Sequence, residues 1–171
     1  SARTLLDLVF QHLVRWLSPS LIFTCEEAWQ ARGNTSSIHL EDFMSVDSEF
    51  KNNELNNKWI IIKNIRKVIT GALEKKRAEK IIGSSLEAHI KIFLTDELKE
   101  SISDASLDEI SITSSFDILT FDESILSYVI EDIKGVGVVV EKVEADKCQR
   151  CWKYVKQITE KNICNRCDAA I

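Results

Sequence analysis

Proline and glycine are scarce in this sequence of 171 residues, which contains one proline and five glycines. A glycine-rich sandwich is therefore disfavoured, because its many turns need these residues. Hydrophobic residues make up 44% of the chain and charged residues 29%. A chain of this size and composition can bury a core as one domain or two small ones, so we expect a folded protein with a helical majority.

Long uninterrupted apolar runs are also missing. The first twenty residues are apolar overall, but Arg3, Asp7, His12 and Arg15 interrupt them and no small-residue cleavage site follows. These charges exclude a signal peptide and a membrane span in this segment. We therefore expect a soluble, cytoplasmic protein without a membrane partner.

Motifs of catalysis are absent as well. The sequence has no phosphate-binding glycine loop, no dinucleotide-binding motif, no nucleophile elbow and no cysteine paired with histidine at a readable spacing. His12, His39 and His89 stand alone, so each is predicted to lie at the surface or at the edge of a core. No residue is a candidate catalyst.

The net charge of -5 hides a strong segregation of charge along the chain. Residues 58–80 contain eight basic residues against two acids, and residues 147–166 contain six basic residues against one acid. Residues 97–132 contain ten acids and a single lysine. Such a chain can present a basic face to nucleic-acid phosphates, although a lysine-rich helix is often only a solvated surface.

Apolar spacing predicts three helices in the first half of the chain. They cover residues 2–17, residues 18 to about 33, and residues 55 to about 80–82. Ser18 is the expected N-cap of the second helix with Pro19 at its first position, and Gly83 is the expected stop of the third. Residues 32–53 are predicted to form a long loop laid across the helices.

The apolar period changes from about 3.6 to two after Gly83, as in a half-buried strand. We predict strands at 86–94, 109–113 and 136–143, and helices at 95–105 and 124–133. The predicted fold is mainly α with an α+β part. It consists of a helical bundle over residues 1–82, a small α+β unit over 83–143, and a zinc knuckle over 144–171.

Four of the five cysteines form two C-x-x-C pairs separated by twelve residues: Cys148, Cys151, Cys164 and Cys167. Two such turns can aim four sulfurs at one ion, which predicts a structural zinc site. Disulfides or a thioredoxin-like redox site explain the pattern less well, because the cysteine count is odd and little chain remains for a βαβ context. A catalytic zinc is disfavoured, since all four ligands would be cysteines. Cys25 is predicted to be a small core residue.

Several segments resemble a known family. Residues 13–19 (LVRWLSP) and 26–29 (EEAW) resemble the helical anticodon-binding domain of class I tRNA synthetases for branched aliphatic amino acids. Residues 72–77 (ALEKKR) and 80–88 (KIIGSSLEA) resemble the segment that leaves this bundle in the isoleucyl and valyl enzymes. The knuckle at 148–152 (CQRCW), with its second cysteine pair, resembles the C-terminal zinc module of bacterial-type isoleucyl enzymes.

The resemblance implies a C-terminal, tRNA-reading part of an enzyme that activates isoleucine with ATP, edits valine errors and charges tRNA. Neither a His-x-Gly-His signature nor a Lys-Met-Ser-Lys-Ser loop is present, so ATP would bind only in the missing catalytic domain and we expect this chain alone to be inactive. We expect a monomer that binds isoleucine-accepting tRNA and one structural zinc. The residues expected to face tRNA are Arg66, Lys67, Lys75, Lys76, Arg77, Lys80, Arg150 and Trp152.

Two other functions remain open on the sequence alone. A zinc ribbon can serve as a protein-interaction module that binds no RNA, and four cysteines can serve as a thiol switch, which is the weaker of the two alternatives.

Overall fold

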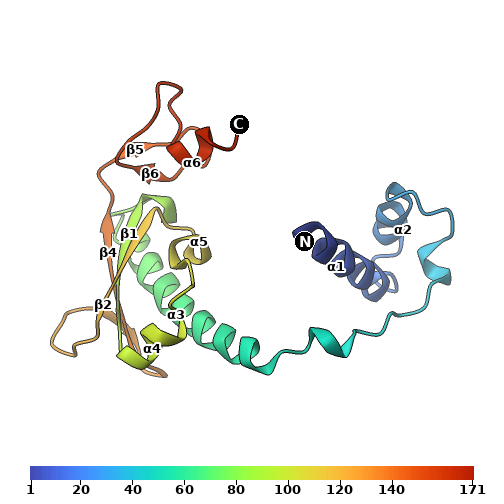
Figure 1. Ribbon diagram of the computed structural model, residues 1–171, viewed down its shortest axis with the longest axis horizontal. Coiled ribbons are helices and arrows are strands. Elements are labelled where there is room, and N and C mark those ends of the chain that lie inside the picture. The colour runs from blue at the N-terminus through green and yellow to red at the C-terminus, as the bar shows by residue number, and fades with distance from the viewer. The chain divides into compact units, whose positions relative to one another are not determined.

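The computed structural model describes residues 1–171, which form two compact units, residues 1–52 and residues 53–171 (Figure 1). The first unit contains two α-helices and two short 3-10 helices. They are α1 (Ala2–Leu17), α2 (Ile22–Ala31), η1 (Ile38–Leu40) and η2 (Ser48–Phe50). Its core consists of four buried side chains: Val14, Cys25, Trp29 and Ile38. The predicted core position of Cys25 is thereby confirmed.

The connection between α1 and α2 differs from the prediction. Ser18 is not the N-cap of the second helix: its hydroxyl donates to the carbonyl of Arg15 at 2.9 Å, so it ends α1 instead. Pro19 then lies in a turn, and α2 begins three residues later at Ile22. A serine hydroxyl that bonds back to its own helix cannot cap the next one, which is why the cap signal was misleading.

The second unit contains α3 (Asn53–Ala78) and a four-stranded mixed sheet. The sheet order is β2-β1-β4-β3, in which β1 and β2 are parallel and the other pairs antiparallel. The strands are β1 (Ala88–Leu94), β2 (Ser115–Thr120), β3 (Tyr128–Ile130) and β4 (Ile133–Lys142), and the short helices are η3 (Ser85–Glu87), α4 (Asp96–Ser101) and α5 (Leu107–Ser111).

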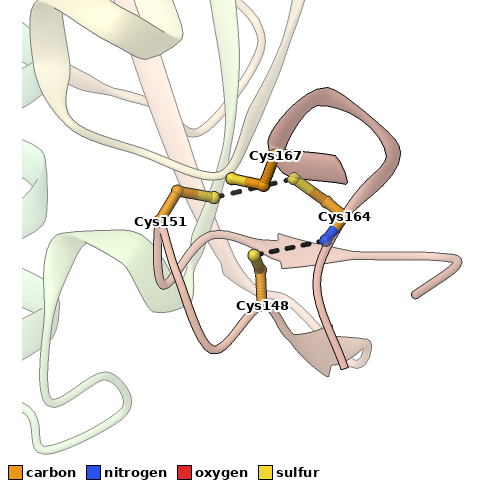
Figure 2. Close-up of side chains that lie close together, drawn as sticks. All are labelled: Cys148, Cys151, Cys164 and Cys167. Atoms are coloured by element: carbon orange, nitrogen blue, oxygen red, sulfur yellow. Dashed lines mark hydrogen bonds between the residues drawn. The ribbon is translucent and has the colours of Figure 1, made fainter. Parts of the chain in front are cut away.

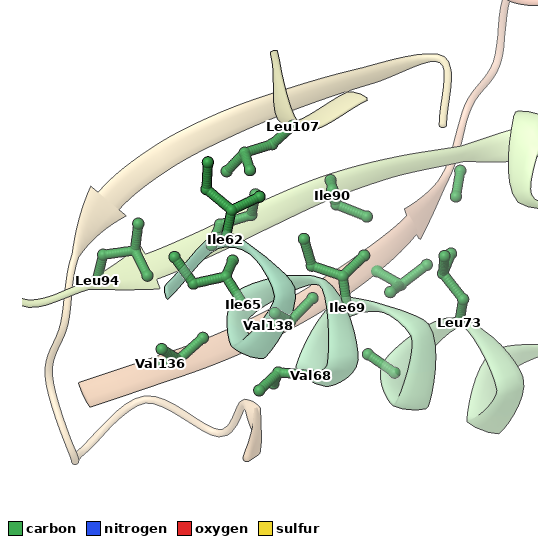
Figure 3. Close-up of a cluster of buried hydrophobic side chains, with 14 of the residues drawn as sticks. Ile62, Ile65, Val68, Ile69, Leu73, Ile90, Leu94, Leu107, Val136 and Val138 are labelled. Carbon is green, nitrogen blue, oxygen red and sulfur yellow. The ribbon is translucent and has the colours of Figure 1, made fainter. Parts of the chain in front are cut away.

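Helix α3 packs against one face of this sheet (Figure 3). Its buried side chains at three- and four-residue steps meet the alternate residues of β1 and β4 that point to the same side. Representative pairs of this core are Ile65 and Ile69 of α3 with Ile90 and Val138 of the sheet. The sequence grouped α3 with the first two helices in residues 1–82, whereas in the structure α3 shares its core with the sheet.

The end of α3 also differs from the prediction. Lys80 adopts the left-handed conformation with φ of 58°, and the amide of Ile81 donates to the carbonyl of Lys76 at 3.0 Å. This is the bonding pattern of a Schellman cap. Lys80 therefore stops the helix three residues before Gly83, the glycine that was expected to do so.

Two elements were assigned the wrong type from the sequence. The predicted strand at 109–113 is part of helix α5, which ends where Ile112 becomes left-handed with φ of 57°. The predicted helix at 124–133 contains the edge strand β3 instead. Strand β2 was missed. The predicted strands at 86–94 and 136–143 are confirmed as β1 and β4, and the predicted helix at 95–105 is confirmed as the shorter α4.

The last part of the chain forms a small module with two very short strands and one helical turn. These are β5 (Asp146–Lys147), β6 (Tyr154–Val155) and α6 (Asn165–Asp168). Across the whole chain, none of the helices has the length and apolar character that a bilayer crossing requires.

Candidate metal centre

Four cysteine side chains converge in the last part of the chain (Figure 2). Their sulfur atoms all lie within 4.8 Å of one another, and the Sγ atoms of Cys151 and Cys164 are 3.8 Å apart. A tetrahedral ion with metal–sulfur bonds of about 2.3 Å requires its ligand sulfurs to be about 3.8 Å apart. The cluster can therefore hold one metal ion.

Two tight turns place these cysteines. In the first turn, the amide of Trp152 donates to the carbonyl of Cys148 at 2.9 Å, and the amide of Cys148 donates to the carbonyl of Lys153 at 3.0 Å. The second pair lies where Asn162, with φ of 57°, leads into α6. The amide of Cys164 donates to the sulfur of Cys148 at 3.2 Å. Backbone bonds of this kind orient a thiolate toward a shared ion.

The thiols of the cluster differ strongly in acidity. Burial raises the pKa of Cys148, but hydrogen bonds from the amides of Cys151, Cys164 and Arg150 outweigh burial and lower this pKa to about 6. Burial, followed by the neighbouring sulfurs, raises the pKa of Cys167 to about 12. Four thiolates this close repel one another, so full ionisation of the cluster requires a cation among them.

The aromatic side chain beside the first turn is largely open to solvent. Trp152 is 59% exposed, and its backbone is left-handed with φ of 63°. A bulky residue in this conformation is strained, and such strain is concentrated at functional positions. The ammonium of Lys147 lies 5.6 Å from the centre of the Trp152 ring, a cation–π contact that the sequence did not predict.

The predicted tRNA-facing arginines are engaged with their own chain. Arg150 donates to the carbonyl of Cys167 at 2.8 Å, which ties the two cysteine turns together. Arg66 donates through Nε to the carbonyl of Ile110 in α5 at 3.0 Å. Arg77 donates to the hydroxyl of Ser85 at 2.6 Å and also pairs with Glu74. These contacts leave part of each guanidinium for a ligand, but they also give each arginine a structural role.

The predicted lysines in α3 and just after its end are more available for a ligand than the arginines. Lys76 pairs with Glu79 at 2.8 Å. Lys67, Lys75 and Lys80 are exposed and take part in no ion pair. A free, exposed ammonium can approach a phosphate without first breaking an internal contact.

Sequence reasoning missed one structural contribution to this centre. Lys153, directly after Trp152, pairs with Asp108 of α5 at 2.6 Å. No local sequence pattern connects two residues that lie 45 positions apart in the chain. The contact becomes visible only once α5 and the cysteine module are placed together.

Comparison with known proteins identifies the family. Residues 1–92 match the family described as the anticodon-binding domain of tRNA ligase. The whole chain is 38% identical to the isoleucine–tRNA ligase of Ruegeria pomeroyi, and 88% of it is 41% identical to those of Bartonella henselae and Mesorhizobium japonicum. The chain spans only 18% of the first relative and 16% of each of the other two. The resemblance predicted from the sequence is confirmed, and the chain belongs to the family of the anticodon-binding domain of tRNA ligases.

Proposed function

We propose that this chain is the C-terminal, tRNA-binding part of an isoleucine–tRNA ligase and that it reads the anticodon region of isoleucine-accepting tRNA. The match of residues 1–92 to the anticodon-binding family carries this proposal. That segment includes all of α3 with its basic residues, and relatives with the isoleucine–tRNA ligase name match beyond it. Aminoacylation itself would be performed by parts of a longer protein.

We propose further that the four cysteines hold one structural zinc ion. The sulfur spacing and the all-cysteine donor set fit Zn²⁺, which favours four thiolates in closed sites. When bound, zinc would cross-link two turns whose own apolar core is very small. The four cysteines would occupy all coordination positions of the ion, so the ion would hold the shape of the module and would not activate a substrate.

The proposed RNA contacts fall into two groups. Trp152 would stack on an unpaired base, as exposed aromatic side chains do in the recognition of single-stranded RNA. Arg150, next to it, would use the remaining N–H groups of its guanidinium on a phosphate or base edge. The free lysines of α3 and of its C-terminal cap would supply phosphate contacts: Lys67, Lys75 and Lys80.

Replacing the exposed tryptophan tests the first group. With zinc bound, Trp152→Ala is expected to weaken tRNA binding by about 1 to 3 kcal/mol, or about 5- to 150-fold, with zinc content and thermal unfolding unchanged. Leu126→Ala is the control, because Leu126 is exposed and lies in the acidic segment, outside both residues 1–92 and the cysteine module. Unchanged affinity in zinc-loaded Trp152→Ala would remove this residue from the interface, and loss of zinc would show it to be structural.

Salt dependence tests the second group. Replacing Lys67, Lys75 and Lys80 by alanine should lower the slope of log affinity against log salt by about 0.7 for each lost contact to a single strand. Lys99→Ala is the control, because Lys99 lies in the acidic segment and already pairs with Asp96. Binding that does not respond to salt would instead favour a protein partner.

A further inference from the structure

Helix α5 joins the cysteine module to the rest of its unit. The Lys153–Asp108 ion pair is only 2.6 Å long, and its side chains are 18% and 17% exposed. Next to it, the amide of Tyr154 donates to the hydroxyl of Ser114 at 2.7 Å. The hydroxyl of Ser114 in turn donates to the carbonyl of Leu86, just before β1. The segment that follows the first cysteine turn is therefore attached to the rest of the unit at two successive residues, Lys153 and Tyr154.

A second ion pair on α5 differs from the first in burial. Arg166 pairs with Glu109 at 2.8 Å, but these side chains are 73% and 54% exposed. An exposed pair of this kind contributes little, because water and salt screen it. Removing one partner of the more buried Lys153–Asp108 pair leaves the other charge poorly compensated. Asp108 is therefore the stronger attachment point.

The stronger attachment lies directly beside the exposed tryptophan. Lys153 follows Trp152 in the chain, and its carbonyl accepts the amide of Cys148. The backbone of Trp152 is thus held on one side by the cysteine turn and on the other by the pair with Asp108. A side chain on a backbone that is fixed from both sides is pre-organised for a ligand, which reduces the entropy lost on binding.

The same short helix also contacts the basic helix. Arg66 of α3 donates to the carbonyl of Ile110, two residues after Asp108. Helix α3, which carries Lys67 and Lys75, is therefore attached to α5 as well.

We infer that Asp108 is a positioning residue for RNA recognition: through Lys153 it holds the cysteine module on α5 and thereby sets the orientation of Trp152. This inference rests on the proposed function, in which Trp152 meets the RNA. Asp108 itself need not contact the ligand. Its effect on affinity should then be limited to the contribution that Trp152 makes.

The test compares zinc-loaded chains that differ at Asp108, Glu109 and Trp152. Asp108→Asn keeps the size of the side chain and its bond with Ser106 but removes the charge that holds Lys153. We expect retained zinc, faster hydrogen exchange at the Tyr154 amide, and weaker binding to isoleucine-accepting tRNA. The loss should not exceed that of Trp152→Ala, about 5- to 150-fold. Glu109→Gln is the matched control on the same helix and should change none of these.

A double variant separates positioning from direct contact. In the Trp152→Ala background, Asp108→Asn should cause no further loss of affinity, because there is no ring left to orient. Independent, additive losses would overturn the inference. So would unchanged exchange at Tyr154 in Asp108→Asn, or release of zinc, which would assign Asp108 to folding.

The two proposals fail in different ways. If Trp152→Ala weakens binding and Asp108→Asn does not, only the positioning role is overturned. If zinc-loaded Trp152→Ala binds as tightly as the unaltered chain, the Trp152 contact is overturned and the role of Asp108 in recognition with it. Lys153→Arg preserves the charge and is expected to retain most of the affinity, whereas Lys153→Met should behave like Asp108→Asn.

Discussion

The core under α3 and the core of the cysteine module are built by different physical means. The first consists of sixteen buried apolar residues, most of them in α3, β1 and β4, and Figure 3 shows the greater part of this cluster. The second has only four buried residues, three of them cysteines: Cys148, Ile163, Cys164 and Cys167. Apolar burial can stabilise the first by itself, whereas so small a cluster needs a cross-link such as a metal ion.

Removal of the proposed zinc ion should have the largest effect on the stability of the cysteine module. Structural zinc contributes about 10 to 16 kcal/mol in comparable small modules, so a strong chelator or Cys151→Ser should unfold residues 148–167. Hydrogen exchange should show lost protection there and retained protection in β1 and β4. Cys25→Ser is the control, since Cys25 lies in the other unit and should not change zinc content. Simultaneous loss of protection in β1 would contradict two separately stabilised cores.

Acid should release the metal from the same module. Protons compete with zinc for thiolates, and the pKa of Cys167, raised to about 12 by burial, keeps this thiol protonated at pH 7 when no cation is present. Zinc uptake at pH 7 should therefore release protons, and the apparent affinity should fall as the pH is lowered. Calorimetric titrations in buffers of different ionisation enthalpy measure the protons released. A zinc affinity that is constant from pH 8 to 6 would contradict thiolate coordination.

A cavity in the apolar core should have the next largest effect. Ile69 is fully buried between α3 and the sheet, so Ile69→Ala should lower the free energy of unfolding by about 2 to 5 kcal/mol. Zinc content should not change. Ile60→Ala on the same helix is the control, because Ile60 is half exposed and should change stability by less than about 0.5 kcal/mol. Denaturant-induced unfolding measures the free energy of unfolding of both variants.

A smaller loss of stability is expected from a change at Gly71, where the ring of Tyr128 lies against α3. A Cβ added at Gly71 would lie 2.5 Å from the hydroxyl oxygen of Tyr128 and 2.7 Å from its ring. Gly71→Ala should therefore destabilise by about 1 to 3 kcal/mol through overpacking, despite a gain of up to about 1 kcal/mol in helix propensity. In a Tyr128→Val background the same change should become neutral or stabilising. Equal destabilisation in both backgrounds would show that the ring is not the obstacle.

The smallest change in stability is expected at Trp152, whose backbone is left-handed. Glycine adopts a positive φ without steric cost, whereas other residues lose about 1 to 2 kcal/mol in the left-handed region. Trp152→Gly should therefore raise the stability of the zinc-loaded module by about 1 kcal/mol relative to Trp152→Ala. Both variants should weaken tRNA binding equally. Competitive zinc titration compares the two modules, and a glycine variant no more stable than the alanine variant would show that the left-handed backbone at this position carries no strain.

Much of the local structure could be predicted from residue patterns. Helix α1 was predicted with its observed bounds, since its apolar residues recur at helical steps. Strand β1 was predicted from the alternation of its apolar residues, and β4 was predicted as a strand introduced by Gly135 and Gly137. The four cysteines were predicted to converge because two C-x-x-C turns carry their own geometry. In each of these cases the signal lies within a few neighbouring residues.

The misassigned elements have weak local patterns. Helix α5 has five residues, too few to show a helical period, and its buried Leu107 is explained only by the core that it joins. Strand β2 lies at the sheet edge without a clear alternation, and its register is determined by parallel pairing with β1. Short elements gain most of their stability from tertiary packing, so their type is not encoded locally.

Local chemistry in the chain was therefore enough to predict the long helices, the central strands, the cysteine cluster and the family. Tertiary structure alone decided that α3 belongs to the sheet core, that α5 is a helix, and that Asp108 meets Lys153 from 45 residues away. The reason is physical: periodicity and turn chemistry act over a few residues, whereas the choice of packing partner depends on which distant surfaces exclude water together.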